Sequence, residues 1–280
     1  MLRTVSGLVA ACHPGPTAFV TALSAAMVLG AGAGARPGPA ALATSAVLSG
    51  QLSVGWSNDW IDATRDLAVG RPDKPVVTGD LTVALLRTAA IAALVLCAVL
   101  SVATGWVAGA VHLVAVASAW AYNLRLKDSV WSPLPYAVSF GLLPVFLIRT
   151  LPGQPMAAGW VVASAALLGA GAHVANVLPD LEDDARTGVR GLPHRWGRAR
   201  SSVVAPAVLL GAVAVAVLGP EGSATGPAVS VGAVAAALAV GAGVVARTRP
   251  RSRAPFGLSM AVAALCVVLL VAAGPATVGS

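Results

Sequence analysis

Long apolar segments recur along this chain of 280 residues, and they decide what it can fold into. Each segment is close to the roughly 20 residues that an α-helix needs to cross the hydrocarbon core of a membrane. Ala, Gly, Val and Leu fill the segments, and the small residues among them allow close helix packing in lipid. We predict nine spanning helices, at 17–35, 39–57, 81–103, 105–122, 133–150, 156–178, 203–219, 226–246 and 255–274.

Composition excludes several other classes of protein. Hydrophobic residues make up 57% of the chain and charged residues only 10%, whereas a soluble domain carries about 25% charged residues. A chain this apolar could not cover its surface in water. We therefore expect a single all-α, multi-pass membrane domain over residues 1–280, with the lipid bilayer as its surroundings. Nucleic acid is not an expected partner, and no obligate protein partner is inferred.

The basic residues predict an orientation, because Lys and Arg stay on the cytoplasmic side of membrane proteins. Sixteen of the eighteen lie at the amino terminus or in connections on one side, and only Arg36 and Arg149 lie opposite. We expect a cytoplasmic amino terminus, an external carboxyl terminus and a location in the cell membrane. Residues 1–16 lack the pattern of a secretory signal peptide and are predicted to be a surface lead-in.

Acidic residues gather in two windows on the predicted cytoplasmic side, which hold nine of the eleven. Asp59, Asp62 and Asp66 are spaced i, i+3, i+7, so they share one face if the helix before them continues. In the second window Asn176, Asp180 and Asp184 are spaced i, i+4, i+8, again on one face, and Pro179 should kink that helix where the polar residues begin. Topology needs basic residues in such connections, but it does not need clustered acids.

Clustered carboxylates indicate a cation. Like charges on one face repel each other unless a cation, water or neighbouring bases screen them, so removing one should leave the metal-free protein as stable or slightly more stable. Mg²⁺ takes one or two carboxylates and completes its coordination with substrate phosphates. Two acidic clusters could therefore hold Mg²⁺ around a diphosphate. The bases that could neutralise the remaining phosphate charge are Arg65, Arg71, Lys74, Lys127, Arg186 and Arg190.

Several motifs resemble those of the UbiA-type intramembrane prenyltransferases over roughly residues 13–275. Residues 58–66 read NDxxDxxxD, and residues 71–75 read RPxKP. Residues 122–127 form a stretch that begins with Tyr and ends with Lys. Residues 180–184 read DxExD and are followed by a Gly and a Leu-Pro pair. The resemblance implies a helical bundle around a central cavity that opens sideways to lipid, and Mg²⁺-dependent transfer of a prenyl group from a prenyl diphosphate to an acceptor. The predicted catalytic and metal-binding residues are Asp59, Asp62, Asp66, Asp180 and Asp184; the predicted substrate-binding residues are Asn58, Arg65, Arg71, Lys74, Tyr122, Asn123, Lys127, Asn176 and Arg190.

Two other functions fit the same residues. An intramembrane terpene cyclase would make the same carbocation and quench it without an acceptor. A cation-coupled transporter would place charges near the middle of the bilayer, whereas here the acids follow apolar segments on one side only. The sequence leaves the acceptor and the prenyl length open. His112 and His173 lie in predicted helices and are interpreted as packing residues.

Overall fold

The computed structural model describes residues 2–30, 37–186 and 188–279, and within these ranges the chain is helical with no strand. Each of the nine predicted segments coincides with a helix, although the end of the first, residues 31–35, lies outside the described residues. The helices are α1 (Leu2–Ala11), α2 (Pro14–Gly30), α3 (Pro37–Val69), α4 (Val83–Ala103), α5 (Trp106–Leu124), α6 (Pro133–Arg149), α7 (Gly159–Val177), α8 (Leu181–Arg186), α9 (Leu192–Leu218), α10 (Gly226–Thr248) and α11 (Ala254–Ala273).

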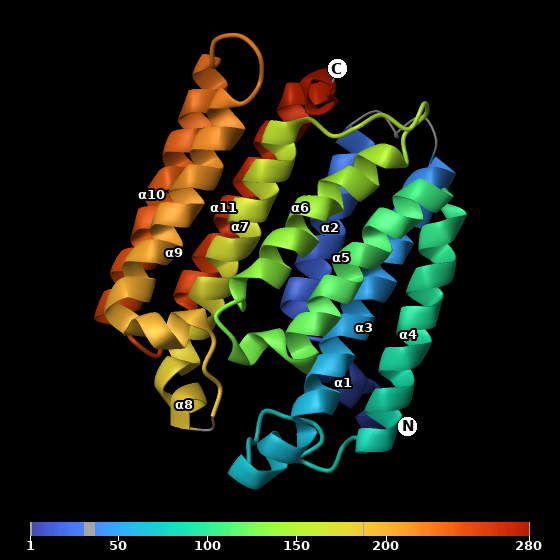
Figure 1. The fold of residues 1–280 in the computed structure, drawn as a ribbon, viewed down its shortest axis with the longest axis vertical. Coiled ribbons are helices and arrows are strands. Elements are labelled where there is room, and N and C mark those ends of the chain that lie inside the picture. The colour runs from blue at the N-terminus through green and yellow to red at the C-terminus, as the bar shows by residue number, and fades with distance from the viewer. Residues whose placement is uncertain (1, 31–36, 187, 280) are drawn as a thin grey trace.

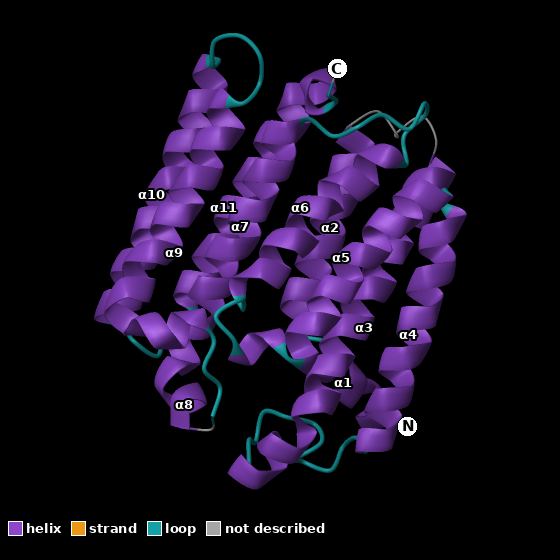
Figure 2. Cartoon of the chain, viewed as in Figure 1, coloured by secondary structure: helices purple, strands orange, loops and turns teal. Residues whose placement is uncertain are grey.

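The long helices lie side by side in one bundle (Figures 1 and 2). In chain order, α3 packs on α4, α5 on α6, α6 on α7, and α10 on both α9 and α11. The core between them is built from large apolar side chains such as Phe146, Leu209 and Val262, which are buried. Many other apolar side chains face outwards, Val99 and Val244 among them, as expected for helices that are surrounded by lipid.

Six helical segments of the described chain are long and apolar enough to cross a membrane: Val83–Ala103, Trp106–Leu124, Gly159–Ala185, Leu192–Leu218, Gly226–Thr248 and Ala254–Thr277. Helices α2 and α6 are apolar but have 17 residues each, and α3 has 33 residues and carries the first acidic window. The fold is therefore that of a multi-pass membrane bundle, with six clear spans and three further helices from the predicted set.

Three helices differ from the predicted segments, and each difference has a physical reason. The predicted lead-in contains α1, which is amphipathic: Val5 and Val9 are exposed, while Leu8 packs beside Trp56 of α3. Helix α3 continues twelve residues beyond 57 because its polar end is buried against basic side chains. Helix α9 (Leu192–Leu218) starts before residue 203, but Gly197 within it has φ 73° and ψ 168°, so a short basic turn precedes the continuous helix. These basic residues carry no apolar signal, and the sequence prediction therefore omitted them.

Candidate active site

The first acidic window lies on the extended end of α3. Because this helix continues to Val69, Asp59, Asp62 and Asp66 occupy one continuous helix, as their spacing predicts. All three carboxylates are buried, with 3%, 9% and 2% of their residue surfaces exposed. Buried carboxylates at this density are unfavourable unless they are paired with bases or bind a cation.

Basic side chains from three other segments neutralise this window. Lys74 Nζ lies 2.7 Å from Asp59 Oδ1, and His13 Nε2 is 3.2 Å from the same oxygen. Arg65 donates to Asp62 Oδ2 at 3.0 Å, and Lys127 forms a close ion pair with Asp62 Oδ1. Screening by neighbouring bases therefore offsets the repulsion expected from the sequence. Removal of the Asp62 carboxylate would leave Lys127 without its partner, so for Asp62 the structure favours a loss of stability over the unchanged or higher stability expected from the sequence.

Burial and ion pairs shift the pKa values of these carboxyls in opposite directions. Burial favours a higher pKa for Asp59, but hydrogen bonds and charge interactions from His13 and Lys74 outweigh it and lower that pKa. For Asp66, burial dominates and raises the pKa. Oδ1 of Asp66 is buried and has no hydrogen-bond partner among the described residues. Asp66 therefore offers an oxygen that a cation could bind.

The second acidic window follows α7 after a short break. Pro179 lies in a 3₁₀ turn, Leu178–Asp180, which separates α7 from α8 where the sequence predicts a kink. Asp180 and Asp184 are half-buried, whereas Asn176 is exposed. Asp184 Oδ2 lies 3.5 Å from Nε2 of His194 at the start of α9.

Glu182 lies in the same window but contacts a different partner. Both of its oxygens accept hydrogen bonds from the Arg198 guanidinium, which also donates to the carbonyl of Pro250 at 2.9 Å. Arg198 therefore links α8 to α9 and to the connection between α10 and α11. From the sequence, Arg198 is placed only on the cytoplasmic basic side, because nothing in the local pattern pairs residues 182 and 198.

Arg71 and the segment that carries Lys127 link the two acidic windows. The hydrogen bonds to Asp73 raise the pKa of the Arg71 guanidinium, and the charges of Asp66 and Asp180 also raise it. Lys127 forms its ion pair with Asp62 of the first window. The Lys127 carbonyl lies close to Gly191, three residues before His194, which contacts Asp184 of the second window.

The predicted substrate-binding amides hold α3 against α5. Asn123 is buried and donates to Ser57 Oγ at 2.9 Å and to the Val54 carbonyl at 3.0 Å. Asn58 in turn donates to Asn123 Oδ1 at 3.2 Å. These bonds fix the register of the acidic end of α3 relative to Tyr122. Their contribution in this structure is to position helices, and contact with substrate stays a prediction.

A second group of contacts fixes the segment that carries Lys127. Ser132 is buried and bonds to His173 Nε2 at 3.1 Å and to the backbone N–H of Leu192 at 3.0 Å. A Cβ at Gly191 would lie only 2.6 Å from the Lys127 carbonyl, so this close approach requires glycine. Ser132 and Gly191 thus connect Lys127 to the start of α9. Ser132 was not predicted from the sequence, because one serine in a connection carries no distinguishing pattern.

The remaining predicted bases differ in placement. Arg65 and Arg71 are half-buried beside the first window, while Arg190 is exposed on the connection before α9. The side chain of Arg186 lies outside the described residues. Most of the predicted bases therefore lie at the acidic end of the bundle.

The donor atoms at this end fit Mg²⁺ bound together with a diphosphate. Within the described residues, no group of three or more His, Cys, Asp or Glu side chains is already gathered as a metal site. Mg²⁺ needs only one or two carboxylates when phosphate oxygens and waters complete its shell. Asp66 Oδ1 supplies an oxygen without a hydrogen-bond partner, and Asp180 and Asp184 supply further carboxylates.

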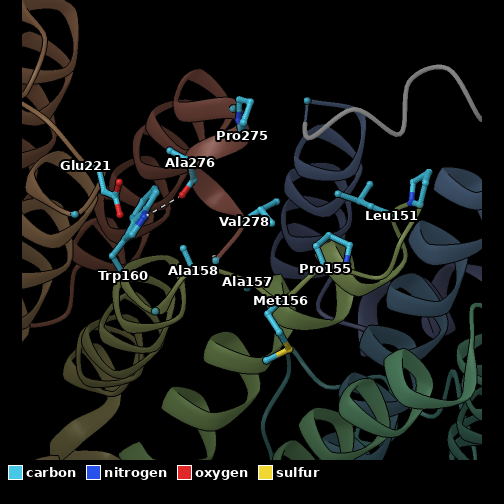
Figure 3. A pocket seen from close by; sticks show the side chains of 16 residues that line it. Leu151, Pro155, Met156, Ala157, Ala158, Trp160, Glu221, Pro275, Ala276 and Val278 are labelled. Atoms are coloured by element: carbon cyan, nitrogen blue, oxygen red, sulfur yellow. Dashed lines mark hydrogen bonds between the residues drawn. The ribbon is translucent and has the colours of Figure 1, made fainter.

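A hollow on the described surface lies at the opposite end of the bundle (Figure 3). It encloses about 1150 Å³ and is lined largely by backbone and apolar groups, with Glu221 as an acidic side chain among the residues that line it. Trp160 Nε1 donates to the Ala276 carbonyl at 3.2 Å across one wall. The hollow is distant from both acidic windows, so size alone does not locate the candidate active site.

Fold and site together define a multi-pass membrane protein with acidic and basic side chains gathered at one end of a helical bundle. Residues 18–265 match the model of the UbiA prenyltransferase family. The chain belongs to the UbiA prenyltransferase family and is therefore an enzyme of the prenyltransferase class.

Similar proteins agree with this assignment. The bacteriochlorophyll synthase 33 kDa chain of Rhodobacter capsulatus is 31% identical over an alignment of 186 residues, and the match covers 58% of this chain and 58% of that protein. Two structures of a UbiA homologue from Archaeoglobus fulgidus, bound to DMAPP with Mg²⁺ and to GPP with Mg²⁺, both give a TM-score of 0.70. Their identities are 18% and 17%, over 95% of this chain and 98% and 99% of those chains. At these identities the likeness concerns the fold.

Proposed function

We propose that this protein transfers a prenyl group from a prenyl diphosphate to an acceptor, with Mg²⁺ bound at the two acidic windows. The observation that carries the proposal is the link between both windows through the Lys127 segment: Lys127 pairs with Asp62, and its carbonyl lies close to Gly191, near the His194 that contacts Asp184. A diphosphate head needs metal and bases, whereas its prenyl tail needs an apolar bundle. The structures of the Archaeoglobus fulgidus homologue with prenyl diphosphates and Mg²⁺ support the same ligand class.

The proposed chemistry is the exchange of one bond for another at the allylic carbon. The bond from that carbon to the diphosphate oxygen breaks, and both electrons leave with the diphosphate. An electron-rich atom of the acceptor then attacks the carbocation and loses a proton. Bound Mg²⁺ would supply charge stabilisation of the leaving diphosphate. Lys74, Lys127 and Arg71 would contribute charge-assisted hydrogen bonds to its oxygens, and the apolar bundle would keep water from the cation.

The proposal includes a membrane arrangement for the whole chain as one domain. Nine helices, α2–α7 and α9–α11, cross the cell membrane, with the acidic windows and the amino terminus in the cytoplasm and the carboxyl terminus outside. The basic bias of the connections supports this orientation. Helix α1, with Val5 and Val9 exposed, would lie along the cytoplasmic surface.

Lipid extracts test the function and do not require the acceptor to be identified first. Membranes from cells that produce the wild-type protein are compared by mass spectrometry with membranes that contain Asp184→Asn in equal amount. The wild type should add a prenylated lipid that the variant lacks. Identical lipid profiles at equal protein levels, with prenyl diphosphate supplied, would contradict the proposal.

A further inference from the structure

Exposed arginines gather on two neighbouring segments that the candidate active site does not use. One segment is the early part of α9, and the other runs from the end of α10 through the connection to α11. The five residues, called the arginine patch below, are Arg200, Arg247, Arg249, Arg251 and Arg253. A hydrogen bond joins the two segments, because Arg198 Nη1 donates to the Pro250 carbonyl at 2.9 Å. Figure 1 shows α9, α10 and α11 side by side at one edge of the bundle, away from α4 and α5.

The protein itself does not neutralise the arginine patch. Within the described residues, none of the five guanidinium groups has an ion-pair or hydrogen-bond partner. Their neighbour Arg198 is different, because it pairs with Glu182. Residues 185–280 contain one acidic residue, Glu221, and it lines the hollow at the opposite end of the bundle. Since like charges at short distances repel each other, the patch favours an anion that comes from outside the chain.

Exposed valines place the arginine patch at the edge of the hydrocarbon layer. Val203 lies three residues after Arg200 on α9, and Val244 lies three residues before Arg247 on α10. Residues at this spacing are neighbours on one helix face. Val203 is 53% exposed and Val244 is 55% exposed, and each lies on the membrane-spanning side of its arginine. On two adjacent helices, therefore, an apolar face that lipid chains can cover ends in a guanidinium group.

This arrangement matches the two parts of a phospholipid. Its acyl chains can cover the valine faces, while its phosphate oxygens accept paired, charge-assisted hydrogen bonds from guanidinium groups. A soluble phosphate would leave the valine faces uncovered. A zwitterionic headgroup carries an ammonium group that the arginines would repel, so a headgroup with a net negative charge fits better. Basic groups between spanning helices are typical binding sites for such headgroups.

We infer that the arginine patch binds the phosphate of an anionic phospholipid, whose acyl chains lie along the Val203 and Val244 faces of α9 and α10. The site is separate from the two acidic windows and does not depend on the proposed transfer of a prenyl group. It would hold a lipid molecule against the three helices that follow the second window.

Native mass spectrometry tests the site without turnover. Purified protein in detergent is titrated with dioleoyl phosphatidylglycerol or dioleoyl phosphatidylcholine, and the lipid-bound states are separated by mass. The wild type should bind the anionic lipid more tightly than the zwitterionic one. Arg200→Gln/Arg247→Gln should weaken binding of the first phosphatidylglycerol about 10-fold or more, because two charges that attract the headgroup are lost.

A matched pair of exposed bases provides the control. Arg87→Gln/Arg125→Gln removes the same charge from α4 and from the end of α5, on the other side of the bundle. This variant should bind phosphatidylglycerol as the wild type does. Glycerol phosphate, which has the phosphate but no acyl chains, should not displace the lipid.

Four results would overturn the inference. Equal affinity for the two lipids in the wild type would show that the anionic headgroup is not recognised. Unchanged affinity in Arg200→Gln/Arg247→Gln would show that these arginines serve orientation in the membrane only. An equal loss in Arg87→Gln/Arg125→Gln would assign the effect to net charge. Displacement by glycerol phosphate at concentrations similar to those of the lipid would make the patch a site for soluble phosphates.

Discussion

At the scale of single residues, Asp62 is where the charges of the candidate active site converge. It is paired with Arg65 and with Lys127. Asp62→Asn should abolish turnover and also lower the melting temperature, because Lys127 loses a buried partner. Adding Lys127→Met to Asp62→Asn should restore part of the melting temperature but no turnover. Recovery of turnover together with stability would show that Asp62 has only a structural role.

Asp184 and Glu182 offer a matched comparison within one motif. Asp184→Asn should abolish turnover, because the proposed Mg²⁺ site loses a charged ligand. Glu182→Gln should keep most of the turnover and lower stability by about 1 kcal/mol or less, since its partially exposed pair with Arg198 is structural. Turnover and melting temperature without metal are measured for both variants. The reverse order, with turnover lost in Glu182→Gln and kept in Asp184→Asn, would contradict the assignment.

Lys74 and Lys127 should bind the diphosphate, although each contacts a carboxylate in this structure. Charge-assisted hydrogen bonds are each worth about 1.5–3 kcal/mol. Lys74→Ala and Lys127→Ala should therefore weaken competition by inorganic diphosphate about 10-fold or more. Arg125→Ala is the control, because this exposed base is two residues from Lys127. Equal inhibition constants in all three variants and the wild type would show that Lys74 and Lys127 do not bind the diphosphate and serve only to set the orientation in the membrane.

At the scale of elements, the turn between α1 and α2 depends on a glycine of α3. A Cβ at Gly55 would lie 2.7 Å from the carbonyl oxygen of Cys12, next to His13, which contacts Asp59. Gly55→Ala should therefore displace this turn and destabilise the protein by about 1–3 kcal/mol. Gly38→Ala on the same helix has no atom within 4 Å and should be neutral. Equal melting temperatures for the two variants would show that the turn can shift freely.

The helices were more predictable than the contacts between them. Apolar length alone located every predicted segment, since lipid requires it. It missed the acidic end of α3 and the basic residues from 192 onward that precede the apolar part of α9, which include the kink at Gly197. The spacing of the acids correctly predicted a helical first window. The second window is not one continuous helix as its spacing suggested, because the 3₁₀ turn Leu178–Asp180, which contains Pro179, separates Asn176 from Asp184. His13, Ser132 and Arg198 were not predicted as site neighbours, because their partners lie 46, 41 and 16 residues away in sequence. Such pairings arise from packing and leave no local pattern.

At the scale of the whole molecule, the orientation in the membrane is predicted from the distribution of basic residues and not from the fold itself. The concentration of basic residues on one side predicts an external carboxyl terminus. A reporter that is active only outside the cytoplasm, fused after Ser280, should be active. The same reporter fused in the 70–82 connection should be silent. Activity with the opposite pattern would contradict the proposed arrangement of nine spans.

Mg²⁺-dependent binding of diphosphate tests the central claim most directly, because it needs neither acceptor nor turnover. Isothermal titration calorimetry would follow inorganic diphosphate binding to the purified protein, with Mg²⁺ and with excess chelator. The wild type should bind only with Mg²⁺, and Asp184→Asn should bind at least about 10-fold more weakly, as expected when a charged contact is lost. Equal binding with chelator, or wild-type affinity in Asp184→Asn, would contradict a diphosphate site formed by the two acidic windows.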